Sequence, residues 1–397
     1  MSDRLKTVLI VAPSIALIIT AAAVLSPTSG GAQSAVTGCD AVAQEVRETR
    51  EVMARFAPQG GSEVQYKQNA LAAAAQAEAA CAAATTTTRP ATTTTTQRPT
   101  TTTRPATTTT APPSGGTQFP NPNNTGVPAG WAPAQVRTTT LRVTTPGAVI
   151  QDLRIDNADL EIAAPNVTVR RVQVRGGVIC NGSADNVCGG VPNGAGNGLV
   201  IEDSSVEPAP GQAQDNRDHW RIGPGGYTLR RVEVVNASDG IRVGGKSFGM
   251  GPVRVEDSLI LVRPPVPCGD WHGDGIQGYD GGAVTVVHTT IDMQVSAGCG
   301  GTAPFFYPRN QGNTSAEVNG LLVAGPNGNY SFRDGMPGKV TGLHIEDNSW
   351  SYGSIDVLCS ALSGWQADIV GPVNRTAGGY KVPAVVRSQP CNTEGGA

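Results

Sequence analysis

Three short segments of the sequence share one pattern, in which an aspartate opens a run of alternating side chains. The segments are DHWRIG (218–223), DGIRVGG (239–245) and DGIQGYDGG (274–282). Aligning their first aspartates puts Arg221, Arg242 and Gln277 at one position. Because side chains alternate between the two faces of a strand, the alignment predicts that all three lie on one outward face, with His219 beside them. Guanidinium groups stacked on such a face can neutralise the carboxylates of a ligand.

This combination of cations and imidazoles favours proton abstraction next to a carboxylate. A cation beside the carboxylate acidifies the neighbouring C–H bond, and a nearby base takes the proton, which is the chemistry of β-elimination. The predicted catalytic residues are His272 and His219 as bases, with Arg242, Arg221 and Lys246 as cations. The residues predicted to bind a sugar chain, mainly by aromatic stacking, are Gln277, Trp271, Tyr279 and Tyr307.

The aspartates that open these segments have two interpretations. Aspartate before glycine is common in turns, where its carboxylate accepts backbone hydrogen bonds, and DGM at 334–336 is a candidate further copy. Carboxylates stacked at strand spacing also repel one another, and arginines, turn hydrogen bonds or a cation must offset that repulsion. Asp239 and Asp274 are therefore candidate calcium ligands, although the sequence contains no EF-hand-like loop.

Two other reaction types are weaker alternatives. SDG (238–240) and GDG (273–275) resemble the paired carboxylates of polygalacturonase-type hydrolases, but no Gly-His-Gly or Arg-x-Lys counterpart follows residue 286. The single G-x-S-x-G match, GKSFG (245–249), is followed by a turn and strand pattern instead of the helix that a serine nucleophile needs. His288 and His344 lie in or beside repeated strands, and we expect structural roles for both.

The elements that must position these residues repeat along the chain. The pattern apolar-x-x-apolar-x-apolar, with Ser or Thr at some middle positions, begins at residues 150, 169, 201, 229, 255, 286, 318 and 340. Short β-branched strands between Gly, Asn and Asp at this period are typical of a solenoid. The steps are shorter than a propeller blade, and helical spacing is absent, so the pattern favours a parallel β-helix, with a β-sandwich as the alternative.

The same region carries a family resemblance. FPNPNNTGVPAGW (119–131), followed by VIQDLRI, VTVRRVQVRGG, LVIEDSSVE and VRVEDSLIL, resembles the exported right-handed parallel β-helix proteins of the pectate lyase superfamily. The resemblance implies an all-β, right-handed parallel β-helix domain over residues 117–397. It says less about function, because this scaffold carries lyases, hydrolases, epimerases and non-catalytic glycan binders.

The N-terminal part of the chain is organised differently. Residues 1–34 combine a basic start with an apolar run, which predicts export through a signal peptide or a membrane anchor. Residues 35–84 carry two helical seams and predict a small helical hairpin, either a docking module or a stapled spacer. Residues 85–116 are rich in Thr and Pro and predict a disordered linker.

The cysteines fit an exported chain that forms disulfides. The pairings suggested by proximity are Cys39–Cys81, Cys180–Cys188, Cys268–Cys299 and Cys359–Cys391, although eight cysteines allow many others.

The composition of the chain restricts the classes of molecule that it can bind. The chain has 397 residues, 15% of them charged, and a net charge of −3, which gives no basic footprint for nucleic acid. We expect a secreted or membrane-anchored protein whose partner is a polysaccharide or a cell-surface glycan. Lyase-like action on an acidic polysaccharide is slightly favoured over glycan binding or adhesion, since a binder needs the arginines and aromatic residues but no base.

Overall fold

A computed structural model describes residues 118–396 apart from 185–186, 218, 270, 296–298, 327, 348 and 377, together with eight helical residues between positions 43 and 78. The chain divides into two compact units, Met1–Thr109 and Thr110–Ala397, each described here by itself. In the described part of the chain, no helix is both long and apolar enough to span a bilayer. The segments predicted over 1–34 and 85–116 lie outside the described residues, as do Cys39 and Cys81.

The described residues of the first unit are helical. Val46, on the seam predicted for the first helix, is 1% exposed. Arg50 Nη2 lies 2.8 Å from Glu78 Oε2, so two helical segments 28 residues apart in sequence contact each other.

The second unit is built almost entirely from parallel β-strands in two sheets. Sheet I contains β1 (Gln135–Arg137), β3 (Val149–Asp156), β5 (Thr168–Arg175), β7 (Leu199–Glu202), β8 (Ser205–Glu207), β10 (Tyr227–Arg230), β11 (Glu233–Ala237), β13 (Val253–Glu256), β14 (Leu259–Val262), β16 (Ala283–Met293), β18 (Ser315–Ala324), β20 (Gly338–Glu346), β22 (Leu362–Val370) and β23 (Val385–Ser388). Sheet II contains β2 (Leu141–Val143), β4 (Leu160–Ile162), β6 (Ile179–Cys180), β9 (Ile222–Gly223), β12 (Ile241–Gly244), β15 (Gly273–Tyr279), β17 (Gly301–Tyr307), β19 (Tyr330–Asp334) and β21 (Gly353–Val357).

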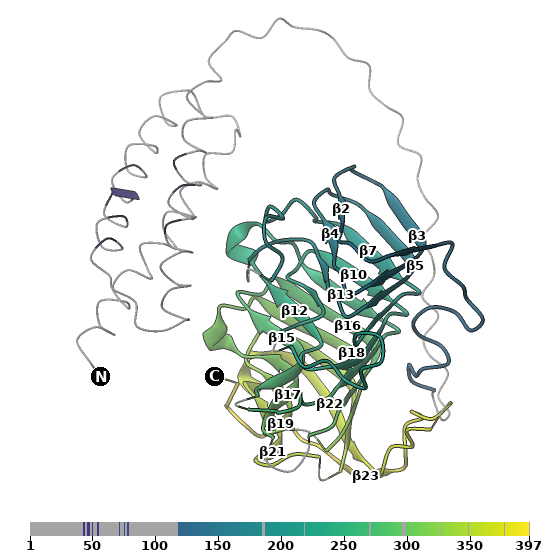
Figure 1. Cartoon of the computed structure of the whole chain (residues 1–397). Helices are drawn as coiled ribbons and strands as arrows, with labels where there is room; N and C mark the ends of the chain where they lie inside the picture. The colour runs from purple at the N-terminus through teal and green to yellow at the C-terminus, as the bar shows by residue number, and fades with distance from the viewer. Residues whose placement is uncertain are drawn as a thin grey trace, which may run out of the picture. The chain divides into compact units, whose positions relative to one another are not determined.

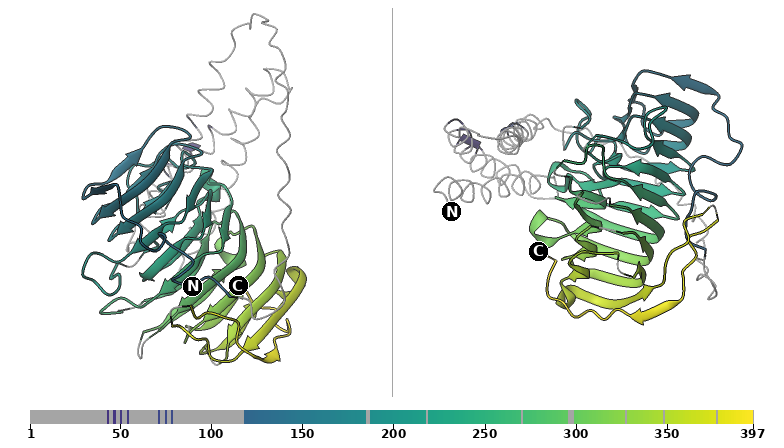
Figure 2. Two further views of the ribbon diagram at one scale, coloured as in Figure 1. Left: turned by 90° about the vertical axis from the view of Figure 1, so that its right-hand side faces the viewer. Right: turned by 60° about the horizontal axis from the view of Figure 1, so that its bottom comes forward.

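The chain alternates between these sheets, and each passage stacks on the one before. For example, β16 pairs in parallel with β18 and β15 pairs with β17, and among the described strands only the final pair, β22 with β23, is antiparallel. Figures 1 and 2 show the strands as successive layers, from blue at the start of the unit to yellow at its end. This architecture is all-β and compatible with a β-helix.

The repeated apolar pattern forms the core between the sheets. In β5, for instance, Val169, Val172 and Val174 are each 0% exposed. Their counterparts one layer away, Ile201 and Val206, are also 0% exposed. The pattern of the sequence therefore predicted the strand positions of sheet I correctly.

The repeated pattern has two residues, instead of one, between its first and second apolar positions, which interrupts strict alternation. The second of these two residues has a left-handed backbone conformation, and the strand bends there. One residue per layer occupies the bend, and the residues before it pair in register from layer to layer, so the bends lie at equivalent positions: Asp152, Arg171, Asp203, Arg231, Asp257, His288, Gly320 and Gly342, with φ values of 55°, 51°, 49°, 53°, 46°, 42°, 83° and 62°. We call these eight residues the bend column. Each bend lets a strand turn while its flanking residues keep pairing with the layers on either side.

Charges alternate along the first part of the bend column. Arg171 Nε and Nη2 donate to the two carboxylate oxygens of Asp152 at 2.7 and 2.8 Å. Arg231 makes the same two-point contact with Asp203 at 2.6 and 2.9 Å. Because guanidinium and carboxylate match in a planar, two-point geometry, each pair fixes the register of the layers it joins.

The disulfides match the expected pairings wherever the structure describes the cysteines. Cys180–Cys188, Cys268–Cys299 and Cys359–Cys391 have Cα–Cα distances of 6.3, 5.8 and 5.7 Å. Three disulfides are consistent with an extracellular protein.

A substitution at Asp203 separates the conformation of the bend from its ion pair. Asp203→Gly removes the carboxylate but tolerates φ > 0, so we expect a loss of about 1 kcal/mol or less in the free energy of unfolding. Asp203→Val also forces a β-branched residue into the left-handed region, which adds about 1–2 kcal/mol. Urea unfolding measures both.

The matched control is Glu202→Val, which removes a charge at the neighbouring, extended position of β7. Equal destabilisation by valine at 202 and 203 would contradict a role for the bend.

Candidate functional site

The outward face of sheet II carries a continuous row of large side chains. In register across β12, β15, β17, β19 and β21 lie Arg242, Gln277, Phe306, Arg333 and Asp356. Their neighbours along the strands, including Ile241, Ile276 and Phe305, are 0% exposed and point into the core. Alternation therefore turns the row outward.

Guanidinium groups stack on aromatic rings along this row. Arg242 Cζ lies 4.4 Å from the centroid of the Tyr279 ring. Arg333 Cζ lies 5.4 Å from the Phe306 centroid and 5.8 Å from that of Tyr330. The Tyr279 and Phe306 rings are 5.8 Å apart, which links the two stacks.

We call the set of Arg242, Gln277, Tyr279, Phe306, Tyr330 and Arg333 the sheet II strip. Tyr352, 74% exposed, continues it beside Tyr330 at a ring distance of 6.0 Å. Asp356 Oδ2 pairs with Arg333 Nε at 2.8 Å at the end of the row.

Gln277 connects the strip to the buried aspartate beneath it. Arg242 Nη1 donates to Gln277 Oε1, and Gln277 Nε2 donates to Asp274 Oδ2 at 2.8 Å. Burial, followed by the charge of Asp239, raises the pKa of Asp274 well above its ordinary value. Asp274 therefore contributes little negative charge beneath Arg242.

Asp239 and Asp274 act on the backbone of the next layer. Asp239 Oδ1 accepts from the Asp274 N–H at 2.8 Å, and Asp274 Oδ1 accepts from the Ala303 N–H at 3.0 Å. These contacts agree with the turn interpretation of the aspartate–glycine motif, in which the carboxylate accepts hydrogen bonds from backbone N–H groups.

The same contacts do not suit calcium. Three carboxylate oxygens of the pair accept hydrogen bonds from N–H groups, whereas calcium needs six to eight oxygen ligands. Among the described residues, no group of three or more His, Cys, Asp and Glu side chains could hold a metal ion.

The register expected for Arg221 is wrong by two residues. Ile222, not Trp220, pairs with Ile241, so Arg221 lies at the level of Gly240 and is 1% exposed. Its Nη2 pairs with Asp215 Oδ2 at 2.6 Å, and burial lowers its pKa to about 10. The apolar contact of Ile222 determined the register, and Arg221 is part of a buried ion pair instead of the strip.

Two of the predicted stacking residues belong to the core. Trp271 is 3% exposed, and its Nε1–H donates to Ser238 O at 3.0 Å. Tyr307 is 0% exposed, and its hydroxyl donates to Gly282 O. Both rings are buried with their polar atoms satisfied by backbone carbonyls, so neither can form the wall of a groove.

The predicted bases and the predicted lysine occupy separate places. His219 lies beside Arg221, with its Nδ1 3.3 Å from Arg221 Nη1, and burial with the nearby arginines lowers its pKa. His272 is exposed directly before β15, two residues ahead of Asp274. Lys246 is exposed in the turn after β12 and donates to Gly312 O.

Sequence reasoning missed Phe306, Tyr330 and Arg333. The signal was present in FFYPR (305–309) and YSFRD (330–334), where Phe305 and Phe332 alternate with the missed side chains. Phe305 pairs with Phe332 in register, and their rings stack at 4.6 Å. Asp334 closes β19 instead of opening a strand, so DGM at 334–336 is not a further copy of the motif.

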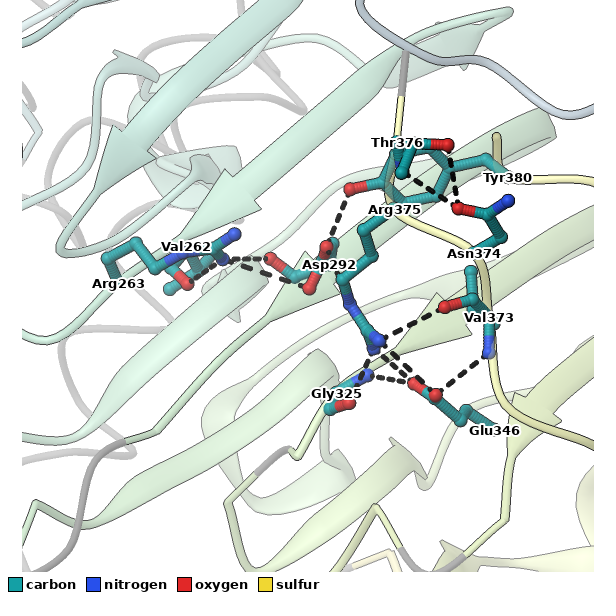
Figure 3. Close-up of polar contacts among 10 residues, drawn as sticks. All are labelled: Val262, Arg263, Asp292, Gly325, Glu346, Val373, Asn374, Arg375, Thr376 and Tyr380. Carbon is teal, nitrogen blue, oxygen red and sulfur yellow. Dashed lines mark hydrogen bonds and ion pairs between the residues drawn. The ribbon is translucent and has the colours of Figure 1, made fainter. Parts of the chain in front are cut away.

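A second ionic cluster lies on sheet I (Figure 3). Arg375 Nε and the Tyr380 hydroxyl donate to Asp292 Oδ2 at 3.1 and 2.6 Å, and Arg375 Nη2 pairs with Glu346. Arg263 Nη1 lies 3.8 Å from Asp292 Oδ1. Asp292 is 0% exposed, so the cluster fastens the loop around residue 375 to β16 and β20 and offers no carboxylate to a substrate.

No family model, curated protein or solved structure matches the chain.

Asp334 gives a pH-dependent prediction. It is 1% exposed, and burial raises its pKa from 3.8 to about 8. The folded state therefore holds this proton more tightly than the unfolded state, so its stabilisation is complete below pH 4 and is lost as the pH rises through 8. The wild type should therefore lose on the order of 5 kcal/mol in its free energy of unfolding between pH 4 and 8. We expect Asp334→Asn, which keeps an acceptor for the Met336 N–H, not to show this loss.

The measurement is the free energy of unfolding in urea at several pH values for wild type and variant. Glu317→Gln, at an exposed position of β18, is the control. A wild-type minus Asp334→Asn difference that stays constant with pH would refute the buried-acid assignment.

Proposed function

We propose that the second unit is a right-handed parallel β-helix of the pectate lyase superfamily type, and that it binds an acidic polysaccharide along the sheet II strip. The fold is supported by parallel layers that alternate between two sheets. Three disulfides support an exported location.

The observation that carries the proposal is the stacking of Arg242 on Tyr279 and of Arg333 on Phe306. An arginine held against an aromatic face loses little side-chain entropy when it binds a carboxylate, because the guanidinium is already placed. Tyr279 and Tyr330, the partly exposed rings beside these guanidinium groups, offer a surface that suits the apolar face of a sugar ring, whereas Phe306 is 5% exposed and only supports Arg333.

The spacing of the two arginines fits an extended polymer. Arg242 on β12 and Arg333 on β19 are three strand intervals apart, about 14 Å at the usual strand spacing of about 4.8 Å. Phe306 lies in register between them. A chain that runs along the stack of layers can place separate acidic groups at both arginines.

Binding is tested with a panel of uronate polymers and a neutral polymer of similar length. Arg242→Gln and Arg333→Gln should each weaken uronate binding by roughly 10- to 100-fold in calorimetry, since each loses a charge-assisted contact. Added salt should weaken wild-type binding as well. Arg254→Gln, an arginine on β13 paired with Glu256, is the control and should bind like wild type. Equal affinity for the neutral polymer would exclude the proposal.

Lyase-like elimination is the second candidate, and the exposure of His272 next to β15 favours it. His272 would act as the base, but Arg242 pairs in register with Gln277, five residues further along the chain than His272, which at about 3.3 Å per residue is too far for Arg242 to hold the same sugar's carboxylate. Hydrolysis is less well supported, because Asp274 is 1% exposed and Asp239 is 7% exposed.

The lyase candidate predicts unsaturated products, detected by ultraviolet absorbance, from at least one uronate polymer. His272→Ala should abolish product formation while leaving binding within about twofold. Absence of new absorbance with every polymer, with binding retained, would leave glycan binding as the function.

A further inference from the structure

The first segment of the second unit runs along the bend column of sheet I. Gly126 N–H donates to Arg231 O at 2.8 Å, and Val127 N–H donates to Ser205 Oγ at 3.1 Å. Ala134 N–H reaches Asp152 O at 2.7 Å. Residues 118–134 therefore form a strap that passes over several layers, and Phe119 at its start is 4% exposed.

His288 holds the start of this strap between two acceptors. Its Nδ1 lies 2.6 Å from Asp257 Oδ1, and its Nε2 lies 3.2 Å from Gln118 O. The imidazole also packs against Phe119, with ring centroids 4.9 Å apart. The next position of the bend column is Gly320, where a Cβ would lie 4.0 Å from the Phe119 ring.

The two acceptors specify a protonation state. A carboxylate and a carbonyl oxygen can only accept, and a neutral imidazole carries a single N–H. Only the imidazolium can donate to Asp257 and to Gln118 together. We propose that the strap is fastened by a doubly protonated His288 and loosens when this imidazolium loses a proton, so that the attachment of residues 118–126 is pH-dependent.

Other charged groups face this contact from the elements packed around it. Arg231 lies on the other side of Asp257 in the bend column and interacts with it electrostatically. His344 packs edge-on against Phe119 at 5.9 Å, with Asp368 3.9 Å from its Nδ1, and burial lowers its pKa.

Lys381 pairs with Gln118 across an antiparallel bridge.

Glu233 acts on the strap in the same direction. Its carboxylate packs against Gly126, where a Cβ would lie 2.8 Å from Oε2. Burial, followed by the charge of Glu207, raises the pKa of Glu233 to about 7. Ionisation of Glu233 as the pH rises therefore also disfavours the docked strap, and the two contributions must be separated by substitution.

Two measurements test the proposal on the full chain. Nitrogen-15 NMR of the four histidines, assigned by substitution, should show His288 with protons on both ring nitrogens at pH 6. Hydrogen exchange should show that protection of the Phe119 amide, which donates to Tyr380 O at 2.9 Å, falls roughly tenfold between pH 6 and 8 after correction for intrinsic exchange.

The variants are His288→Asn, which suits the left-handed backbone, and Glu233→Gln. In His288→Asn the pH dependence at Phe119 should shrink to the part that Glu233 contributes, and in the double variant His288→Asn/Glu233→Gln it should vanish. In Glu233→Gln the dependence at Phe119 should persist. His272→Asn is the matched control and should keep the wild-type pH dependence of hydrogen exchange at Phe119. A singly protonated His288 ring at pH 6, or unchanged pH dependence in His288→Asn, would overturn the proposal.

Discussion

The bend column is the constraint on which the second unit depends. A strand that only alternated would place like positions one above another, and like charges at strand spacing would repel. Here one left-handed residue per layer bends the strand. In the first layers a carboxylate at the bend of one layer contacts a guanidinium at the bend of another, as Asp152 does with Arg171 and Asp203 with Arg231. Since each layer is continuous with a strand of sheet II, the register fixed at the bend also determines which side chains become neighbours on the opposite sheet.

The sheet I layers were predictable because their information is local and repeated. The apolar positions of each layer recur at the same three offsets, so the other layers show how to align a layer whose own pattern is ambiguous. Sheet II offered no such redundancy at β9, which is two residues long and follows a long connection. Aligning aspartates there placed Arg221 beside Arg242, whereas Ile222 pairs with Ile241 and Trp220 packs in a separate buried cluster that includes the Cys180–Cys188 disulfide. The neighbours Arg242 and Gln277, on longer strands, were predicted in register correctly.

Aspartate illustrates why residue type alone does not identify a site. Asp203 is partly exposed and pairs with Arg231 on the surface. Asp274 is buried and organises the backbone of the next layer while holding Gln277 under Arg242. Asp334 faces the core, where burial favours its neutral form. Asp274 and Asp334 thus share burial and a raised pKa but differ in their partners: Asp274 contacts Gln277 and the backbone of the next layer, whereas Asp334 accepts from the Met336 N–H two residues along its own chain.

The two sheets also divide their outward faces between different tasks. On sheet I, the strap covers the bend column, and the Arg375 cluster holds a second segment over β16 and β20. Both contacts use charged groups that are satisfied within the chain, as when Tyr380 and Arg375 share Asp292. On sheet II, Arg242, Gln277 and Arg333 are partly exposed, and the rings of Tyr279 and of the buried Phe306 stack on the two guanidinium groups. A ligand that approaches sheet I would have to displace buried ion pairs, which costs several kcal/mol, whereas on sheet II it meets Arg242, which donates to Gln277, and Arg333, whose partly exposed pair with Asp356 costs about 1 kcal/mol or less to displace. This difference in cost is the physical reason to look for the binding surface on sheet II.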